Sequence, residues 1–189
     1  MRLNATAVII AGGKSSRMQK DKALLPFGKY NTLSEYQFVR LSKIFENIYL
    51  SAKVNKFDFE VTVLEDNYST SSPLVALISI FENLKEEEIF VLSVDAPFVS
   101  ELVINQLYNE AKEGVDVIVA ESTQGLEPLC AIYRKSFLKE AYAALNENRH
   151  RLQGLFSHLN VQRVKINDKE IFTNLNYLEE YQEASKRVR

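Results

Sequence analysis

The sequence predicts an α/β protein with three layers, in which helices cover both faces of a mostly parallel sheet. Short apolar runs recur along the chain, stretches with helical periodicity separate them, and polar residues follow several runs where a strand would end. Strands that alternate with helices imply right-handed crossovers and parallel pairing. In such sheets ligands bind at the carboxyl ends of the strands, so we expect the functional residues there.

The first expected element is a strand that ends at Ile10, because two glycines follow it. Thr32 and Glu35 form a capping box that opens a helix expected to reach Phe45. Residues 86–88 are expected to be a solvated connection. The other expected elements are strands at 47–51, 61–64, 89–94, 116–120, 128–133 and 161–166, and helices at 73–84, 100–114, 136–147, 151–159 and from about 177.

The composition limits the class of protein. With 46% hydrophobic and 25% charged residues over 189 positions, the chain can bury a core, and its length fits one domain over residues 1–189. The net charge of −2 argues against nucleic acid as a partner. We find neither a spanning segment nor a signal peptide, so we expect a cytoplasmic protein without a membrane partner. Cys130 is expected to fill the core in a reducing compartment.

The segment after the first strand is dense in anion-binding groups. Gly12 and Gly13 can adopt positive φ and lack a Cβ, so backbone N–H groups can converge there on an anion. This segment differs from the P-loop, because Val8 stands where that motif needs its first glycine, and it lacks the third glycine of the dinucleotide fingerprint. A polyphosphate is the ligand that fits best, and a basic surface turn is the alternative. The cations and hydroxyls are those of Lys14, Ser15, Ser16, Arg17, Lys20 and Lys22.

Two acidic residues follow strands at the same expected edge. Asp95 directly follows an apolar strand, where an unpaired carboxylate would be costly to bury. Mg²⁺ prefers one or two protein carboxylates together with substrate phosphates, so Asp95 is the expected metal ligand. The alternative is that Asp95 caps the turn before Pro97. For Asp66 the alternative to a role in binding is an Asx turn.

The string Ala11-Gly12-Gly13-Lys14-Ser15-Ser16-Arg17-Met18, followed by Asp21-Lys22, resembles the signature of nucleotidyltransferases, in particular the molybdenum cofactor guanylyltransferase family. The resemblance implies a Rossmann-like nucleotidyltransferase fold. It also implies transfer of GMP from GTP to the terminal phosphate of molybdopterin, with release of pyrophosphate and with Mg²⁺ as the cofactor. Molybdenum cofactor insertion proteins and acceptor redox enzymes would be further partners.

The same resemblance implies roles for individual residues. Arg17, Lys22 and Asp95 would be catalytic, and Asp95 would also bind the metal. Asn174 and Asn176 match an Asn-x-Asn segment that would bind the pterin substrate, although a simple turn is the alternative. The nucleotide would be bound by Ile10, Ala11, Gly12, Gly13, Lys14, Ser15, Lys22, Ser51, Asp66 and Asp95.

Some positions depart from the family pattern. Gln19 replaces a glycine at the exit of the basic segment, and Ser51 stands where the family commonly has Asn. Ser72 and Ala76 replace two glycines near the expected base site, so guanine specificity stays open. One alternative is a cytidylyltransferase of the same fold that acts on molybdopterin or on a sugar or polyol phosphate. Another is a non-catalytic nucleotide-binding regulator.

Overall fold

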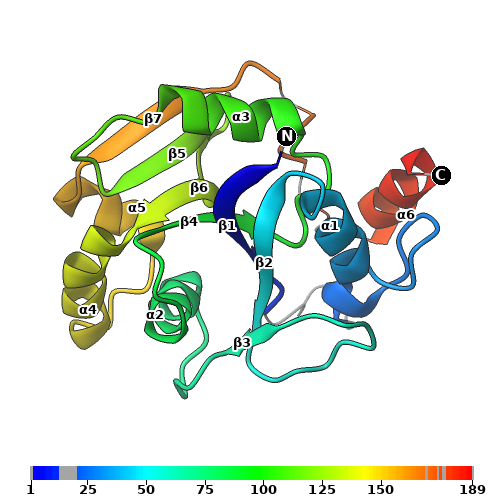
Figure 1. Cartoon of the computed structure of the whole chain (residues 1–189), viewed down its shortest axis with the longest axis horizontal. Coiled ribbons are helices and arrows are strands. Elements are labelled where there is room, and N and C mark those ends of the chain that lie inside the picture. The colour runs from blue at the N-terminus through cyan, green and yellow to red at the C-terminus, as the bar shows by residue number, and fades with distance from the viewer. Residues whose placement is uncertain (1, 13–20, 169, 174, 176–177, 189) are drawn as a thin grey trace.

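The computed structural model describes residues 2–12, 21–168, 170–173, 175 and 178–188. In this part of the chain a seven-stranded sheet has the order β3-β2-β1-β4-β6-β5-β7 (Figure 1). Its strands are β1 Leu3–Ile10, β2 Phe45–Ala52, β3 Val63–Glu65, β4 Glu88–Ser93, β5 Val117–Ser122, β6 Gly125–Arg134 and β7 Val161–Lys165.

The helices cover both faces of the sheet, as the sequence predicts. They are α1 Leu33–Leu41, α2 Pro73–Asn83, α3 Glu101–Glu110, α4 Leu138–Asn146, α5 Leu152–Leu155 and α6 Leu178–Arg187, with 3-10 turns η1 Lys22–Leu24, η2 Lys135–Phe137 and η3 Phe156–His158. Figure 1 shows α1 and α3 on one side of the sheet and α2 and α4 on the other. None of the described helices is long and apolar enough to cross a membrane.

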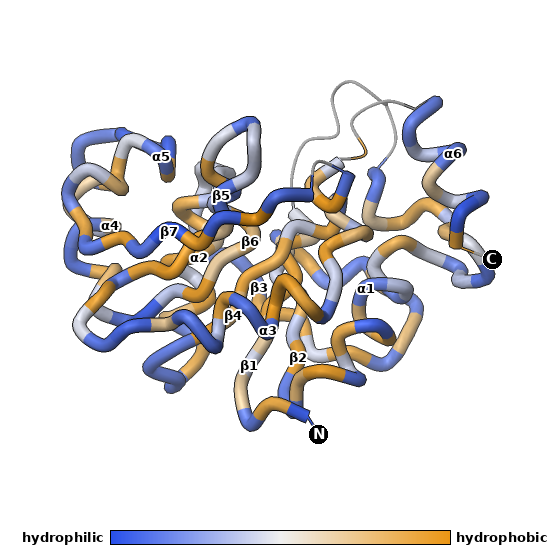
Figure 2. The backbone as a smooth tube through the Cα atoms, turned by 90° about the horizontal axis from the view of Figure 1, so that it is seen from above, coloured by the Kyte–Doolittle hydropathy of each residue, from blue (hydrophilic) through white to orange (hydrophobic). Residues whose placement is uncertain are grey.

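Two hydrophobic cores lie on the two faces of the sheet. Alternate residues of β1 serve them: Ala7 and Ile9 belong to the core beneath α1 and α3, whereas Val8 and Ile10 belong to the core beneath α2 and α4. The central strands β1 and β4 consist mainly of hydrophobic residues, whereas α6 is mainly hydrophilic in Figure 2. Alternation of burial within one central strand confirms the predicted three-layer architecture.

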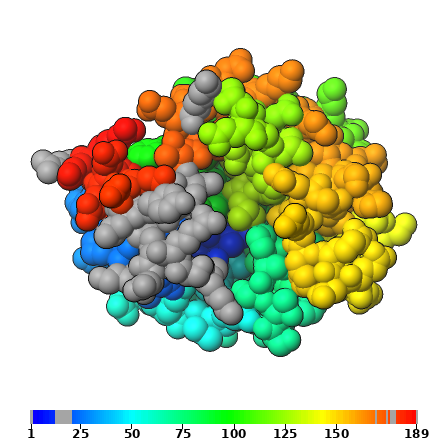
Figure 3. All heavy atoms as spheres, turned by 180° about the vertical axis from the view of Figure 1, so that it is seen from behind, coloured from blue at the N-terminus to red at the C-terminus, as the bar shows by residue number. Residues whose placement is uncertain are grey.

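The C-terminal helix packs against the N-terminal third of the chain. The phenol of Tyr181 donates to the Pro26 carbonyl, and its ring meets that of Phe27 at 5.8 Å between centroids. The Gly28 N–H donates to the Ser185 hydroxyl at 3.0 Å. Figure 3 shows α6, in red, beside the blue surface of this early segment. The C-terminal helix therefore packs against the segment directly after η1.

One strand runs against the others. β6 pairs antiparallel with both β4 and β5, whereas the remaining pairs of the sheet are parallel. Only Thr123 and Gln124 separate β5 from β6, and a connection this short joins antiparallel neighbours. The amino end of β6 consequently lies at the carboxyl edge of the parallel strands, and Leu129 reaches the pocket described below.

Several predicted boundaries were wrong. The helix expected to reach Phe45 ends at Leu41, and Phe45 is instead the first residue of β2. Its predicted cap is present, since the Thr32 hydroxyl accepts from the Glu35 N–H at 3.0 Å. The helix expected at 151–159 is a four-residue α5 followed by η3. Glu88 is not part of a solvated connection, because it begins β4 and accepts from Arg134 Nε at 2.8 Å.

Candidate active site

The site lies where the order of the sheet reverses. β1 has β2 on one side and β4 on the other, so the chain proceeds outward in two directions from this strand. In parallel α/β sheets a crevice forms at the carboxyl ends of the strands at such a switch point. The register brings Ile10 beside Ser51 of β2 and Ser93 of β4. The ends of three neighbouring strands, two of which carry a serine, therefore border one crevice.

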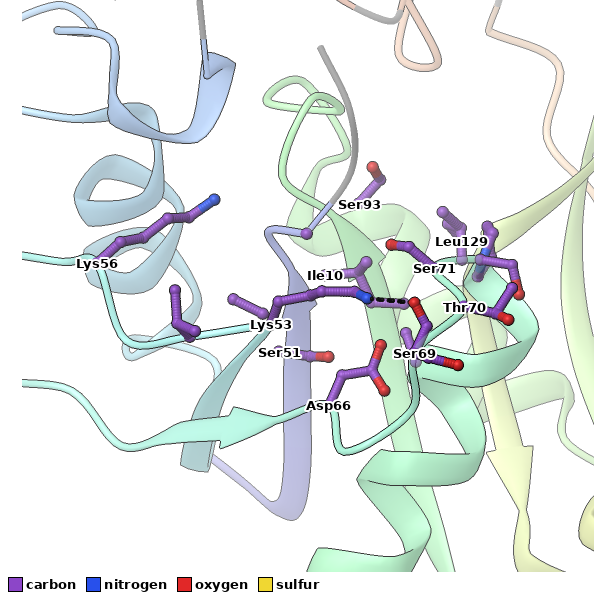
Figure 4. A pocket seen from close by; sticks show the side chains of 16 residues that line it. Ile10, Ser51, Lys53, Lys56, Asp66, Ser69, Thr70, Ser71, Ser93 and Leu129 are labelled. Atoms are coloured by element: carbon purple, nitrogen blue, oxygen red, sulfur yellow. Dashed lines mark hydrogen bonds between the residues drawn. The ribbon is translucent and has the colours of Figure 1, made fainter. Parts of the chain in front are cut away.

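A pocket of about 770 Å³ occupies this crevice, a size typical of small-molecule sites (Figure 4). Four residues predicted to bind nucleotide line it, namely Ile10, Gly12, Ser51 and Asp66. The loop 69–72 and the first turns of α2 close the opposite side. Ala11, also predicted to bind nucleotide, is buried beside the pocket, and its N–H donates to the Ser51 carbonyl at 2.9 Å.

Gly12 contributes an open surface to the pocket. It does not have the positive φ that the sequence suggested; Gly28, Gly114 and Gly125 are the described glycines that do. A Cβ placed on Gly12 would meet the Ala52 Cα at 3.7 Å, which is an ordinary contact. The fold therefore does not require glycine at this position. Its absence of a side chain instead allows a ligand to approach the backbone.

Asp66 is fixed in its orientation at the floor of the pocket. Its Oδ1 accepts from the Tyr68 N–H at 2.9 Å and from the Ser79 hydroxyl at 3.2 Å. The first bond is the Asx turn considered as an alternative, and the second holds the carboxylate against α2. Asp66 therefore forms the Asx turn and also lines the pocket, so it presents a carboxylate of fixed orientation to a ligand.

Lys53 crosses the same pocket. Its ammonium donates to the carbonyls of Tyr68 at 3.2 Å and Ser69 at 3.0 Å, and Figure 4 shows it extended from the end of β2 toward this loop. The sequence analysis did not identify this residue, because one lysine in a polar loop gives no distinctive pattern. It joins the loop after β3 to the loop after β2 and places a positive charge in the pocket.

Lys22 and Asp95 face each other beside the pocket. Lys22 begins η1, Asp95 follows β4, and Lys22 Nζ lies 3.6 Å from Asp95 Oδ2. Their side chains are only 13% and 25% exposed. The Ser93 hydroxyl, which lines the pocket, donates to Asp95 Oδ1 at 2.6 Å. Two residues predicted to be catalytic are thus brought together, and Ser93, which the sequence analysis missed, orients one of them.

A buried polar network supports the end of β4. Gln37 is fully buried, and its amide donates to the carbonyls of Ser93 at 3.4 Å and Val94 at 3.2 Å. The Arg40 guanidinium donates from Nε to Gln37 Oε1 at 3.0 Å, and burial lowers the pKa of Arg40. A sequence signal existed, because Gln37 stands between Leu33 and Leu41 on the buried face of α1.

The C-terminal segment also reaches this site. The Leu175 N–H donates to the Asp95 carbonyl at 3.1 Å. Leu175, the middle residue of the Asn-x-Asn segment, therefore lies beside the end of β4. Asn174 and Asn176 themselves lie outside the described residues, as do Gly13, Lys14, Ser15 and Arg17 of the basic segment.

The donor set at Asp95 suits a metal that is shared with a phosphorylated ligand. Among the described residues no three His, Cys, Asp or Glu side chains are grouped to hold a metal ion by themselves. Asp95 supplies one partly exposed carboxylate beside the pocket. Mg²⁺ is commonly bound by one or two carboxylates that are completed by substrate phosphates and water. This chemistry fits Asp95, whereas a closed structural metal site does not.

Comparison with known proteins assigns the chain to a family. The model of the MobA-like NTP transferase domain matches residues 7–164. The chain belongs to this family. Residues 7–164 contain every pocket residue and catalytic candidate named above except the Asn-x-Asn segment.

A curated relative matches this chain over its full length, and solved structures of the same fold match nearly all of it. A molybdenum cofactor guanylyltransferase of Campylobacter jejuni subsp. jejuni serotype O:6 is 36% identical over 192 residues and covers 100% of both chains. Molybdopterin-guanine dinucleotide biosynthesis protein A from Archaeoglobus fulgidus has a TM-score of 0.82 at 18% identity, covering 96% of this chain and 97% of that one. Rv0371C of Mycobacterium tuberculosis H37Rv, solved in complex with manganese, has a TM-score of 0.64 at 14% identity, covering 98% and 100%.

Proposed function

We propose that this chain transfers GMP from GTP to the terminal phosphate of molybdopterin, forming molybdopterin guanine dinucleotide and pyrophosphate. The observation that carries the proposal is the pairing of Lys22 with Asp95 at the edge of the pocket that contains Asp66. A cation and a carboxylate side by side suit a triphosphate that brings a divalent metal with it. The names of the full-length relatives in the family support the choice of substrates.

The nucleoside occupies the pocket in this proposal. Asp66 and Ser51 hold the nucleoside, and the backbone from Ile10 to Gly12 borders it. Gly13, Lys14, Ser15 and Arg17 bind the triphosphate, with Arg17 as a bidentate clamp. Asn174 and Asn176 bind the pterin substrate, and the support for this is that Leu175, between them in the sequence, donates its N–H to the Asp95 carbonyl.

The reaction is an in-line displacement at the α-phosphorus. An oxygen of the acceptor phosphate forms a bond to that phosphorus while the bond to the bridging oxygen of pyrophosphate breaks. The acceptor is already an anion at neutral pH, so the protein needs to supply position and charge rather than a general base. Lys22 stabilises the charge that develops on the α-phosphate oxygens. Bound through Asp95, Mg²⁺ supplies further neutralisation of the triphosphate.

The nearest rival is a cytidylyltransferase of the same fold. Ser72 and Ala76, which replace glycines of the family pattern, both line the pocket and reduce the space beside a base. The Ser72 hydroxyl also caps α2 and lies 3.1 Å from His150 Nδ1, so this wall is fixed. A pocket of about 770 Å³ nevertheless has room for a purine nucleoside.

Pyrophosphate release tests the proposal. Purified protein is incubated with Mg²⁺, molybdopterin and labelled GTP, and unlabelled CTP is then added in excess. We expect release with GTP that excess CTP leaves nearly unchanged. Faster turnover of CTP would favour the cytidylyltransferase, and binding of GTP without release in the presence of molybdopterin would favour a regulator.

The remaining assignments follow from this proposal. We propose that residues 1–189 form one nucleotidyltransferase domain and that the protein acts in the cytoplasm. Its product would pass to molybdenum cofactor insertion proteins and to acceptor redox enzymes.

A further inference from the structure

Lys56 connects two segments that lie far apart in the sequence. It belongs to the loop between β2 and β3 and lines the pocket (Figure 4). Its ammonium donates to the Ala11 carbonyl at 3.1 Å, directly after β1, and forms an ion pair with the Asp21 carboxylate, directly before η1. The side chains of Lys56 and Asp21 are 23% and 34% exposed, so water reaches this junction only in part.

The two oxygens of the Asp21 carboxylate have different partners. Oδ1 accepts from the Ala23 N–H at 3.1 Å and so caps η1, while Oδ2 meets Lys56. The Asp21 carbonyl also accepts from the Leu24 N–H at 3.1 Å and closes the same turn. Lys22 is the first residue of this turn. The orientation of Lys22 therefore depends on where Asp21 is held, and Lys56 holds Asp21 against the end of β1.

We propose that Lys56 is a positioning residue for Lys22. By joining the Ala11 carbonyl to the Asp21 carboxylate, it fixes η1 relative to the sheet and keeps the Lys22 ammonium against Asp95. The proposal rests on the function proposed above, because positioning matters where Lys22 must meet a phosphate in the transition state. A lysine that met the carboxylate alone at an exposed surface would contribute little. Here the same ammonium also binds the backbone directly after the central strand β1.

Lys53 provides a contrast within the same loop. Its ammonium binds the carbonyls of Tyr68 and Ser69 and so supports the far side of the pocket. Lys56 turns the other way, toward Ala11 and Asp21. The two lysines of this loop support opposite sides of the site, and of the two only Lys56 contacts the segment that carries Lys22. The Ser34 hydroxyl of α1 also donates to the Ala23 carbonyl of this turn at 2.9 Å, but Lys56 is the side chain that joins the turn to the end of β1.

Kinetics of single and double variants test whether Lys56 acts through Lys22. Lys56→Met removes the ammonium and keeps the stem, Lys56→Arg keeps the charge, and Lys135→Met removes an ion pair with Glu87 at the opposite edge of the sheet. We expect Lys56→Met to lower kcat about tenfold with little change in KM for GTP. Lys56→Arg should restore most of kcat, and Lys135→Met should match the wild type. In a Lys22→Met background, Lys56→Met should cost no more than about twofold further.

Two kinetic results would overturn the proposal. If the losses from Lys22→Met and Lys56→Met multiply in the double variant, Lys56 acts on substrate independently of Lys22. If Lys56→Met alone has the kcat of the wild type, the contacts of Lys56 with Ala11 and Asp21 do not position Lys22 for the reaction. Asp21→Asn, which keeps an oxygen for the cap but loses the charge, should reproduce the effect of Lys56→Met.

A second measurement needs no activity. A short pulse of acetic anhydride, followed by mass spectrometry, reports how accessible the Lys22 amine is in the folded protein. We expect Lys22 to be acetylated several times faster in Lys56→Met than in the wild type or Lys135→Met, with thermal unfolding confirming that all three are folded. Equal rates in all three would overturn the proposal. Absence of pyrophosphate release by the wild type would count against the proposed function alone, since the labelling result would still stand.

Discussion

Lys22 Nζ and Asp95 Oδ2 lie 3.6 Å apart, although the two residues come from a turn after the basic segment and from the end of β4. The switch point between β1 and β4 brings these segments together, and Ser93 and Gln37 orient the end of β4. A cation and an anion therefore lie side by side next to the pocket that Ser93 lines. Such preorganisation is the main source of catalysis in phosphoryl transfer.

Replacement of Asp95 tests the metal assignment. Asp95→Asn retains an oxygen that can accept from the Ser93 hydroxyl but removes the negative charge. We expect turnover in Mg²⁺ to fall at least about 100-fold, while the unfolding temperature stays within a few degrees of that of the wild type. Pyrophosphate release measured over a range of Mg²⁺ concentrations checks this. Near-normal turnover at low Mg²⁺ would show that Asp95 is not the metal ligand.

Replacement of Lys22 tests stabilisation of the transition state. Lys22→Met should lower kcat by about 100- to 1,000-fold, the cost of removing a preorganised group that acts on developing charge. The kcat of Lys22→Arg should lie between those of the wild type and Lys22→Met, because a planar guanidinium keeps the charge but cannot reproduce a compact ammonium at the same place. Steady-state kinetics measure kcat and the KM for GTP separately. A rise in KM for GTP with unchanged kcat would mean that Lys22 contributes only to binding.

The network beneath β4 should govern stability. Gln37→Leu leaves the Arg40 guanidinium without the Gln37 acceptor and leaves the Ser93 and Val94 carbonyls without their donor. We expect a loss of about 1–3 kcal/mol in the free energy of unfolding, measured with urea. Gln182→Leu, at an exposed position of α6, is the control and should change stability by no more than about 0.5 kcal/mol. Equal effects would mean that the network is not structurally important.

Glu127 should make stability depend on pH. It lies half-buried in β6, and burial raises the pKa of its carboxyl group, although a hydrogen bond from the Ser122 hydroxyl lowers it. The folded state therefore holds this proton more tightly than the unfolded state, so folding stability falls as pH rises through the ordinary value toward the raised one.

Glu127→Gln should consequently be slightly more stable than the wild type at pH 7 and equally stable near pH 4. The expected gain in unfolding temperature at pH 7 is about 2 °C or less, because water screens a half-buried carboxylate. Thermal unfolding followed by circular dichroism at both pH values checks this. A variant that is less stable at pH 7 would show that the charged form is favoured in the folded protein.

The parts of the fold with strong local signals were predictable. The buried strand before Gly12, the Thr32 cap and the Ser72–Pro73 start of α2 each follow from residues close together in the sequence. The convergence of Lys22 with Asp95 followed from one rule about parallel sheets together with a family resemblance. Each of these predictions depended on a few residues whose types and spacing are sufficient to indicate the structure.

Other features depend on contacts that no local pattern encodes. The end of α1 at Leu41 was missed because Phe45 is equally suited to a helix face and to a buried strand. The reversed direction of β6 follows from a two-residue connection whose length was misjudged when both strands were predicted too short. Lys53 and Lys56 acquire their roles only from carbonyls and a carboxylate contributed by distant segments.

A crystal of the protein soaked with GTP and Mn²⁺, with anomalous data collected at the manganese edge, tests the central claim most directly. We expect one manganese peak within coordination distance of the Asp95 carboxylate, Lys22 against the α-phosphate, and the base in the pocket between Ser51 and Ala76. A triphosphate bound elsewhere, or manganese held by residues other than Asp95, would contradict the account.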